Sequence, residues 1–214
     1  MNAHAPTDHV TRRSFTLSFG VLASGIVTSA LGLLALVGWV LGLPLLANFG
    51  VDLIPMAPST AVLFVLYGAA VCLRARLPLS RRVFWISVAA GCLGTLIALL
   101  LFTLGCLDIQ WSVEHLGLNA TGTVHGATTG HMSPVAAFCF LLASMSFLTS
   151  LSRSATRPWR TALALGAAGV LLGTCLIFLL AYLYGAPLLY GGKFIPPALN
   201  TILAFAMQIG RAHV

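Results

Sequence analysis

Carboxylate and imidazole side chains gather in one long polar segment of the chain, residues 107–132. This segment carries Glu114, His115, His125 and His131. Imidazole nitrogens and carboxylate oxygens are ligands for divalent metals, and imidazole also titrates near neutral pH. The spacing of these residues matches no metal-ligand pattern, and the chain between them is rich in glycine and threonine. The sequence favours a solvated connector without a structural metal, and it leaves a pH-sensitive or small-ligand patch as the alternative.

A second feature is a Pro-containing string that runs three times into an apolar segment. The copies are IPMAPSTAVLF at 54–64, GHMSPVAAFCF at 130–140 and, more loosely, IPPALNTILAF at 195–205. Proline suits the first turn of a helix, where its missing N–H would have had no intrahelical partner. We therefore predict helix starts at Pro58, Pro134 and Pro197. Ordinary helix starts at the outer membrane surface are favoured, and the alternative is that three helix N-termini converge and attract an anionic group.

Membrane spans are the elements that must position these residues. With 59% hydrophobic residues, 7% charged residues and a mean hydropathy of +1.00, a soluble globule of 22.4 kDa is excluded. A transmembrane helix needs roughly 20 apolar residues. Uncharged runs of that order predict spans at about 14–43, 53–73, 83–107, 132–152 and 161–184, with a shorter sixth at 195–208.

The three strings each open an even-numbered span. We therefore expect an all-α, polytopic membrane protein with six transmembrane helices arranged as three consecutive helical hairpins. In the third copy, the best alignment pairs Thr201 with Thr60 and Phe205 with Phe64, which leaves Pro196 and Pro197 slightly earlier than the other prolines.

Basic residues predict the orientation, because they favour the cytoplasmic side of short loops. Nine arginines precede or connect the spans on one face, and Lys193 stands alone on the other. The N-terminus and the end of a completed sixth span are therefore expected in the cytoplasm. The net charge of +7 follows from this asymmetry and does not indicate binding to nucleic acid. The nine arginines are Arg12, Arg13, Arg74, Arg76, Arg81, Arg82, Arg153, Arg157 and Arg160.

The predicted span cores contain no Asp, Glu, Lys, Arg or His. Ion-coupled transport usually needs ionisable groups inside the membrane, and a haem held between helices needs axial ligands. Hydrolysis inside the membrane needs a nucleophile with a base in reach. The sequence therefore predicts no catalytic residue, no cofactor and no enzymatic activity for the chain as given.

Two GxxxG strings could pack helices closely, GWVLG at Gly38–Gly42 and GVLLG at Gly169–Gly173. Small residues let transmembrane helices approach one another. Packing within the chain is the favoured use of both strings, and homodimer formation is the alternative.

The apolar strings resemble the N-terminal multi-span region of bacterial sensor histidine kinases and hybrid kinases. The likeness rests on GLPLLANFGVDLIPMAPSTAVLFVLYGAA, TGHMSPVAAFCFLLASMSFL and YGAPLLYGGKFIPPALNTILAF, and it covers most of residues 39–208. In such proteins, cytoplasmic PAS, kinase or diguanylate cyclase modules follow the membrane part. The resemblance implies a sensory input or anchor domain in the bacterial inner membrane. The chain departs from the pattern because it contains no output module.

The sixth predicted span is short, since 14 residues of helix extend roughly 21 Å against a hydrocarbon core of roughly 30 Å. The final residues, IGRAHV at 209–214, coincide with one reading frame of a sequencing adapter. We divide the chain into a cytoplasmic tail at 1–13, a membrane sensor or anchor domain at 14–208 and adapter-derived residues at 209–214. We expect a cytoplasmic output module in the parent chain. The alternative function is a self-contained membrane protein that transports or binds a small solute.

Overall fold

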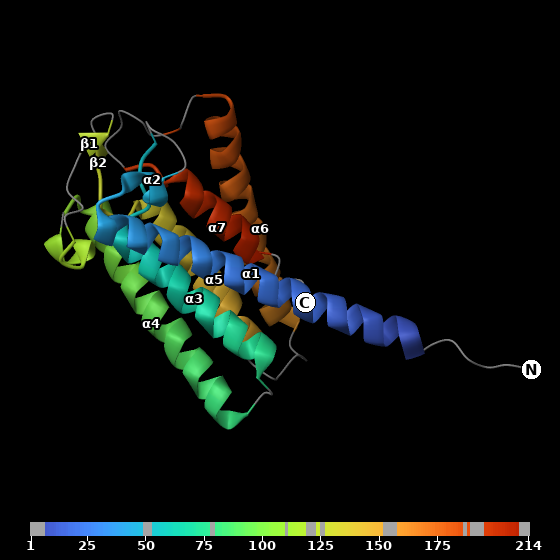
Figure 1. The fold of residues 1–214 in the computed structure, drawn as a ribbon. Coiled ribbons are helices and arrows are strands. Elements are labelled where there is room, and N and C mark those ends of the chain that lie inside the picture. Colours follow the sequence, from blue (N-terminus) through green and yellow to red (C-terminus); the bar gives the residue numbers. More distant parts are fainter. Residues whose placement is uncertain are drawn as a thin grey trace, which may run out of the picture.

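A computed structural model describes residues 7–48, 53–77, 80–109, 111–118, 123–124, 127–151, 158–185, 188 and 195–209. Helices make up nearly all of this structure (Figure 1). They are α1 (Thr7–Leu41), α2 (Pro44–Ala47), α3 (Pro58–Arg76), α4 (Arg81–Cys106), the 3-10 turn η1 (Ser112–His115), α5 (Pro134–Leu151), α6 (Pro158–Leu183) and α7 (Leu199–Ile209). The short strands β1 (Thr123–Val124) and β2 (Ala127–Thr128) pair antiparallel.

Five of the described helices are long and apolar enough to cross a membrane. They are α3, α4, α5, α6 and the part of α1 from Phe19 to Leu41. The chain is therefore a multi-pass helical membrane protein by length and composition. Helix α1 begins at Thr7, inside the segment assigned to a tail, because a helix that forms in the apolar run can continue into polar residues beyond it. Helix α7 is apolar but has only 11 residues.

The proline strings predict two of three helix starts correctly. Helix α3 begins at Pro58 and α5 begins at Pro134. Helix α7 instead begins at Leu199, so the predicted start at Pro197 is wrong. The carbonyl of Pro197 accepts a hydrogen bond from the Tyr182 hydroxyl, 2.9 Å away, and this contact holds Pro197 in the chain that leads into the helix.

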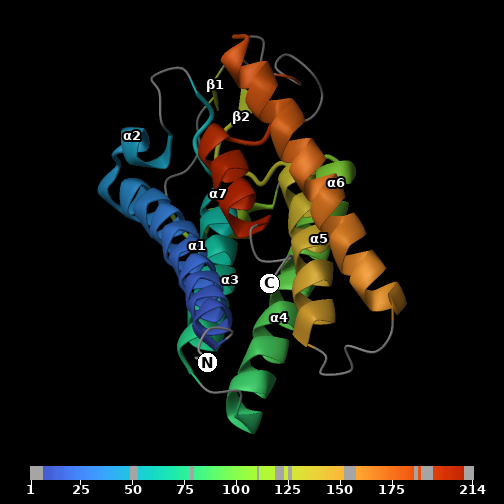
Figure 2. The ribbon, with the colours of Figure 1, turned by 90° about the vertical axis from the view of Figure 1, so that its right-hand side faces the viewer.

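The helices form a closed ring in which consecutive helices pack together. Helix α1 packs mainly on α3, and α4 packs mainly on α5. Helix α6 packs on α5 and, less extensively, on α7, and contacts of α3 with α4 and of α7 with α1 complete the ring. Figure 2 shows α7 lying between α1 on one side and the α5–α6 pair on the other. We call α3, α5 and α7 the inner helices, because they meet at the centre, and α1, α4 and α6 the outer helices.

An aromatic triangle holds the inner helices together. Phe64 of α3, Phe140 of α5 and Phe205 of α7 are almost fully buried, and their ring centroids lie 4.6–4.9 Å apart in all three pairs. These residues end the three aligned strings at 64, 140 and 205. The repeated string thus places one phenylalanine from each inner helix at the same level of the bundle.

Glycines bring α1 close to α3. A Cβ added to Gly32 would lie 2.6 Å from the carbonyl oxygen of Ala61, and one added to Gly25 would lie 3.1 Å from the carbonyl oxygen of Gly68. The glycines of the two GxxxG strings do not contact α3 in this way. Gly38 packs on α2 inside the chain, but among the described residues no atom of another element lies near the Cβ position of Gly169.

Gly173 of the string GVLLG also has no described atom near its Cβ position. The prediction that this string packs within the chain is therefore wrong. That string lies on the outward face of α6, where apolar side chains such as Val170 and Leu172 are about half exposed. Its glycines leave a shallow strip that no described residue covers.

Candidate functional site

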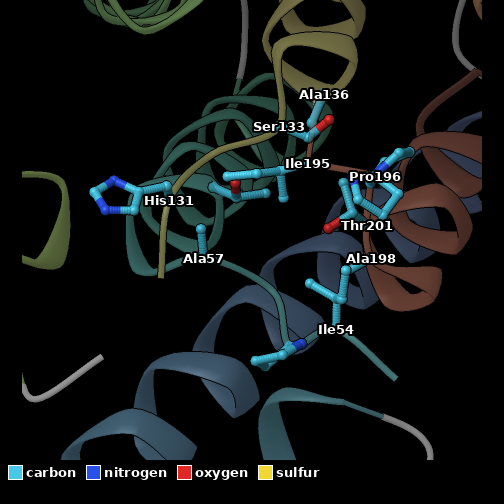
Figure 3. Close-up of a pocket in the computed structure, with 12 residues that line it drawn as sticks. Ile54, Ala57, His131, Ser133, Ala136, Ile195, Pro196, Ala198 and Thr201 are labelled. Atoms are coloured by element: carbon cyan, nitrogen blue, oxygen red, sulfur yellow. The ribbon is translucent and has the colours of Figure 1, made fainter. Parts of the chain in front are cut away.

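A recess lies at the end of the bundle where the three inner helices begin, which we call the recess end (Figure 3). Its cavity volume is about 10 Å³, which is room for about one water molecule. Its wall repeats in three parts. The residue before each inner helix and the third residue of each helix line it, namely Ala57 and Thr60, Ser133 and Ala136, and Ala198 and Thr201.

The first turns around the recess have few side-chain caps. The first N–H groups of a helix have no intrahelical acceptor and usually bond to the side chain of the preceding residue. The methyl side chains of Ala57 and Ala198 cannot accept this bond, and Ala57 gives α3 no side-chain cap. In α7, the Asn200 side chain accepts from the N–H of Thr201 at 3.0 Å.

Ser133 precedes α5 and belongs to a residue type that favours this capping position. It is only 5% exposed, yet its hydroxyl has no hydrogen-bond partner among the residues that the structure describes. A buried hydroxyl without a partner loses hydration energy that nothing in the protein returns. The hydroxyl is therefore a polar group at the recess that is ready to bond to something else.

Each inner helix is held by a hydrogen bond to the backbone of the residue two positions before its start. Met56, Met132 and Pro197 occupy equivalent positions two residues before their helices. The Trp39 indole of α1 donates to the carbonyl of Met56 at 2.7 Å, and the Tyr182 hydroxyl of α6 donates to that of Pro197 at 2.9 Å. An aromatic side chain from an outer helix thus fixes the lead-in of two inner helices.

Helix α5 is anchored by the outer segment instead. The backbone N–H of Met132 donates to Oε2 of Glu114 at 2.9 Å, and Nδ1 of His131 lies 3.7 Å from the same oxygen. The Nε2 atoms of His131 and His115 are 3.2 Å apart, within hydrogen-bond distance. We call Glu114, His115 and His131 the outer cluster. His131 is also among the residues that line the recess, although Figure 3 shows its imidazole turned away from the other lining residues.

Two side chains of the outer cluster are buried, although residues 107–109, 111–113, 116 and 117 of the same segment are exposed. Glu114 and His115 are 7% and 8% exposed. The compact turn η1 carries both side chains onto the start of α5, and the left-handed residue Leu116 ends this turn with φ of 52°. Spacing along the chain could not indicate this contact, because the two histidines come from opposite ends of the segment.

Burial sets the protonation preference of the outer cluster. Loss of hydration lowers the pKa of His115, the neighbouring His131 lowers it further, and Glu114 opposes both effects. Among the described residues, no group of three or more His, Cys, Asp or Glu side chains is arranged to hold a metal ion. Protonation of His115 is therefore disfavoured while the cluster is folded.

The predicted site residues have different outcomes. The structure brings Glu114, His115 and His131 together, whereas His125 lies outside the described residues. Sequence reasoning missed Ser133 and Thr201 as recess residues. Both stand inside the repeated strings, so the repeat itself was the signal that could have found them.

Comparisons with protein-family models, with curated proteins and with solved structures find no match to this chain.

Proposed function

We propose that the chain is the membrane input or anchor domain of a bacterial signal-transduction protein in the inner membrane. In this proposal, α7 belongs to a sixth span, and the recess end faces the outside of the cell. The arginine end, where α3 and α5 finish and α4 and α6 begin, faces the cytoplasm. The described arginines of α3, α4 and α6 lie at that end, which agrees with the preference of basic residues for cytoplasmic loops.

The closed centre of the bundle supports sensing over transport. The recess leads toward Phe64, Phe140 and Phe205, whose rings contact one another across the axis. From Phe19 onward, charged side chains in the described helices stand only in first or last turns. A transport route usually places ionisable or water-lined groups at membrane depth. A centre closed by these three rings suits detection of a stimulus better than passage of a solute.

The arrangement of helices offers a way to pass a signal. Inner helices begin at the recess, and α3 and α5 run to the arginine end. A ligand or proton that changes the packing at the helix starts would act on rigid elements that reach the other membrane face. The resemblance to sensor kinase membrane regions supports the same role.

The decisive test is the genomic context. Long-read sequencing through the codon for Gln208 should find an open frame that encodes a kinase, PAS or cyclase module. A stop codon directly after Val214 in clean genomic DNA would contradict the signalling role and support a self-contained solute-binding membrane protein.

Orientation has its own test. Reporter or cysteine tags placed at Arg76 and Arg157 should be cytoplasmic, and a tag near Gly122 should be accessible from outside. The two arginine sites serve as matched controls for the third. If the Gly122 tag reacts only after the membrane is disrupted, the proposed orientation is wrong.

A further inference from the structure

We infer that the protein binds the headgroup of an anionic phospholipid where α3 ends and α4 begins. This inference goes beyond the proposed sensory function and does not depend on it. Three observations support it: exposed guanidinium groups without a carboxylate partner among the described residues, an apolar stripe that continues from them along α4, and a helix start at the same place.

Three exposed arginines form what we call the basic corner, namely Arg76 at the end of α3 and Arg81 and Arg82 at the start of α4. The four residues that connect Arg76 to Arg81, with the sequence LPLS, carry no charge. Figure 1 shows the end of α3 and the start of α4 at the same end of the bundle. The basic corner therefore holds three positive charges that are open to the surroundings of the protein.

The chain offers these arginines little negative charge. It has four acidic residues in all. Asp52 precedes the start of α3, and Asp108 and Glu114 follow the end of α4, whereas the basic corner lies at the other end of both helices. The fourth, Asp8, is in the first turn of α1. Basic residues at a membrane surface attract anionic headgroups, and here no described carboxylate forms an ion pair with the three guanidinium groups.

Arg74 is used differently and supports the basic corner from inside. Its Nη1 donates to the Ser150 hydroxyl of α5 at 3.5 Å, and its guanidinium carbon lies 6.0 Å from the centre of the Phe147 ring. Because these contacts hold the last turn of α3 on α5, the nearby guanidinium of Arg76 extends from a packed part of the bundle.

An apolar stripe continues from the basic corner along α4. Residues three and four positions apart lie on one face of a helix. Starting from Arg82, this spacing gives exposed apolar residues at Ile86, Ala89, Leu93, Leu96 and Leu100. A phospholipid whose phosphate lies at Arg82 would place its acyl chains along this stripe. Free phosphate would contact the arginines alone, so the stripe favours a lipid as the source of the anion.

Trp85 places the basic corner at the level of lipid headgroups. It lies one helical turn after Arg81, is 57% exposed, and packs edge-on against Phe84 with 5.7 Å between the ring centroids. Exposed tryptophan prefers the interface between headgroups and hydrocarbon. The phosphate of a lipid at this depth lies beside the guanidinium groups of Arg81 and Arg82.

The start of α4 adds a partial positive charge at the same place. The first N–H groups of a helix have no intrahelical acceptor, and together they attract anions. The Ser80 hydroxyl accepts from the N–H of Val83 at 3.3 Å. The N–H groups of Arg81 and Arg82 precede this bond in the first turn and can donate to a phosphate oxygen.

The charge of the basic corner selects the kind of headgroup. Phosphatidylcholine carries a quaternary ammonium beside its phosphate, and three guanidinium groups repel that cation. Phosphatidylglycerol has no cation, and its phosphate can accept paired hydrogen bonds from a guanidinium group. The basic corner should therefore bind a lipid with net negative charge in preference to a zwitterionic one.

The test uses the full chain in detergent, with dioleoyl phosphatidylglycerol as the probe and native mass spectrometry to count bound lipids. Phosphatidylcholine with the same acyl chains is the comparison lipid. Phosphatidylglycerol should bind about tenfold more tightly. Glycerol phosphate has the charge without the acyl chains and should not compete at the same concentration. Equal binding of the two lipids, or full competition by glycerol phosphate, would overturn the inference.

Paired variants locate the site. Arg81→Gln with Arg82→Gln should reduce the preference for phosphatidylglycerol to about twofold, whereas Arg81→Lys with Arg82→Lys keeps the charge and should retain most of it. Arg12→Gln with Arg13→Gln removes the same charge before the first span and should leave the preference unchanged. Helix content, measured by circular dichroism, should be the same in all three proteins. An unchanged preference in the first variant, or an equal loss in the Arg12 and Arg13 control, would show that the basic corner is not the site.

Discussion

The outer helices α1, α4 and α6 are more hydrophobic in their apolar stretches than the inner helices α3 and α5, and they are less buried. The helices differ in the share of buried residues in their most apolar stretches. This share is 56% in α3, 22% in α1 and 28% in both α4 and α6. Lipid is as apolar as leucine, so hydrophobicity alone cannot drive one helix to the centre of the bundle. Shape decides instead. The inner helices carry the aromatic triangle, and the outer helices carry leucine-rich faces.

The outer helices also differ among themselves in how they use glycine. In α1, glycines face the backbone of α3 at close range, whereas Gly169 and Gly173 of α6 face outward. The same residue type therefore closes an interface in one outer helix and leaves a surface open in another. Homodimer formation through the α6 strip stays a prediction.

The largest expected effect comes from breaking the aromatic triangle. Phe140→Ala should lower the free energy of unfolding by about 3 kcal/mol, because it opens a cavity between three helices that cannot easily close. Unfolding by a denaturing detergent, followed by circular dichroism, would measure it. Phe19→Ala is the matched control, since Phe19 is 65% exposed on an outer helix and should change stability little. Equal losses in both variants would remove the distinction between inner and outer helices.

A smaller effect is expected at the α1–α3 interface. Gly32→Ala should destabilise the protein by about 2 kcal/mol, because the new methyl group would lie 2.6 Å from a backbone oxygen that cannot turn aside. Gly169→Ala should be neutral or stabilise by about 0.5 kcal/mol, since nothing lies near its Cβ position and alanine favours helix. The same unfolding assay compares them. A larger loss at Gly169 would indicate a partner on the outward face of α6.

The smallest expected effect is pH-dependent and concerns how α5 is anchored. The folded protein lowers the pKa of His115, so the unfolded or opened segment binds a proton more readily. The stabilising contribution of the neutral side chain should be complete above about pH 6.5 and decline as the pH falls toward the lowered folded value. Hydrogen exchange at the Met132 amide, which donates to Glu114, should therefore quicken in acid after correction for intrinsic rates.

His115→Gln provides the control for this experiment. Glutamine keeps a polar group beside His131 and does not titrate, so the acid-induced change should become smaller. If Met132 exchanges with the same pH dependence in both proteins, another group controls the outer cluster.

Several features of the fold were predictable because they depend on local sequence. Proline at Pro58 and Pro134 identified helix starts, because only a first turn tolerates its missing N–H. The aligned strings also paired Phe64 with Phe205, and these residues contact one another in the structure. Periodic repeats can be read from the chain, since each copy folds under the same local rules.

The start of α7 was not predictable in the same way. Pro197 stands in the place of Met56 and Met132, and the bond from Tyr182 keeps its carbonyl outside the helix. The partner lies on another helix, so local propensity holds no information about it. The burial of Glu114 and His115 was missed for the same reason, because a polar loop looks solvated until its contacts are known.

The sequence by itself determined that this is a helical, multi-pass membrane protein, because apolar runs must satisfy their backbone groups internally. It also determined the repeat and two of the three inner helix starts. Only the tertiary structure decided that these starts surround one recess, that Ser133 is buried there without a partner among the described residues, and that Glu114 lies beside His131. Those facts depend on distances between segments far apart in the chain. They arise from how the helices pack, and composition and spacing do not encode that packing in readable form.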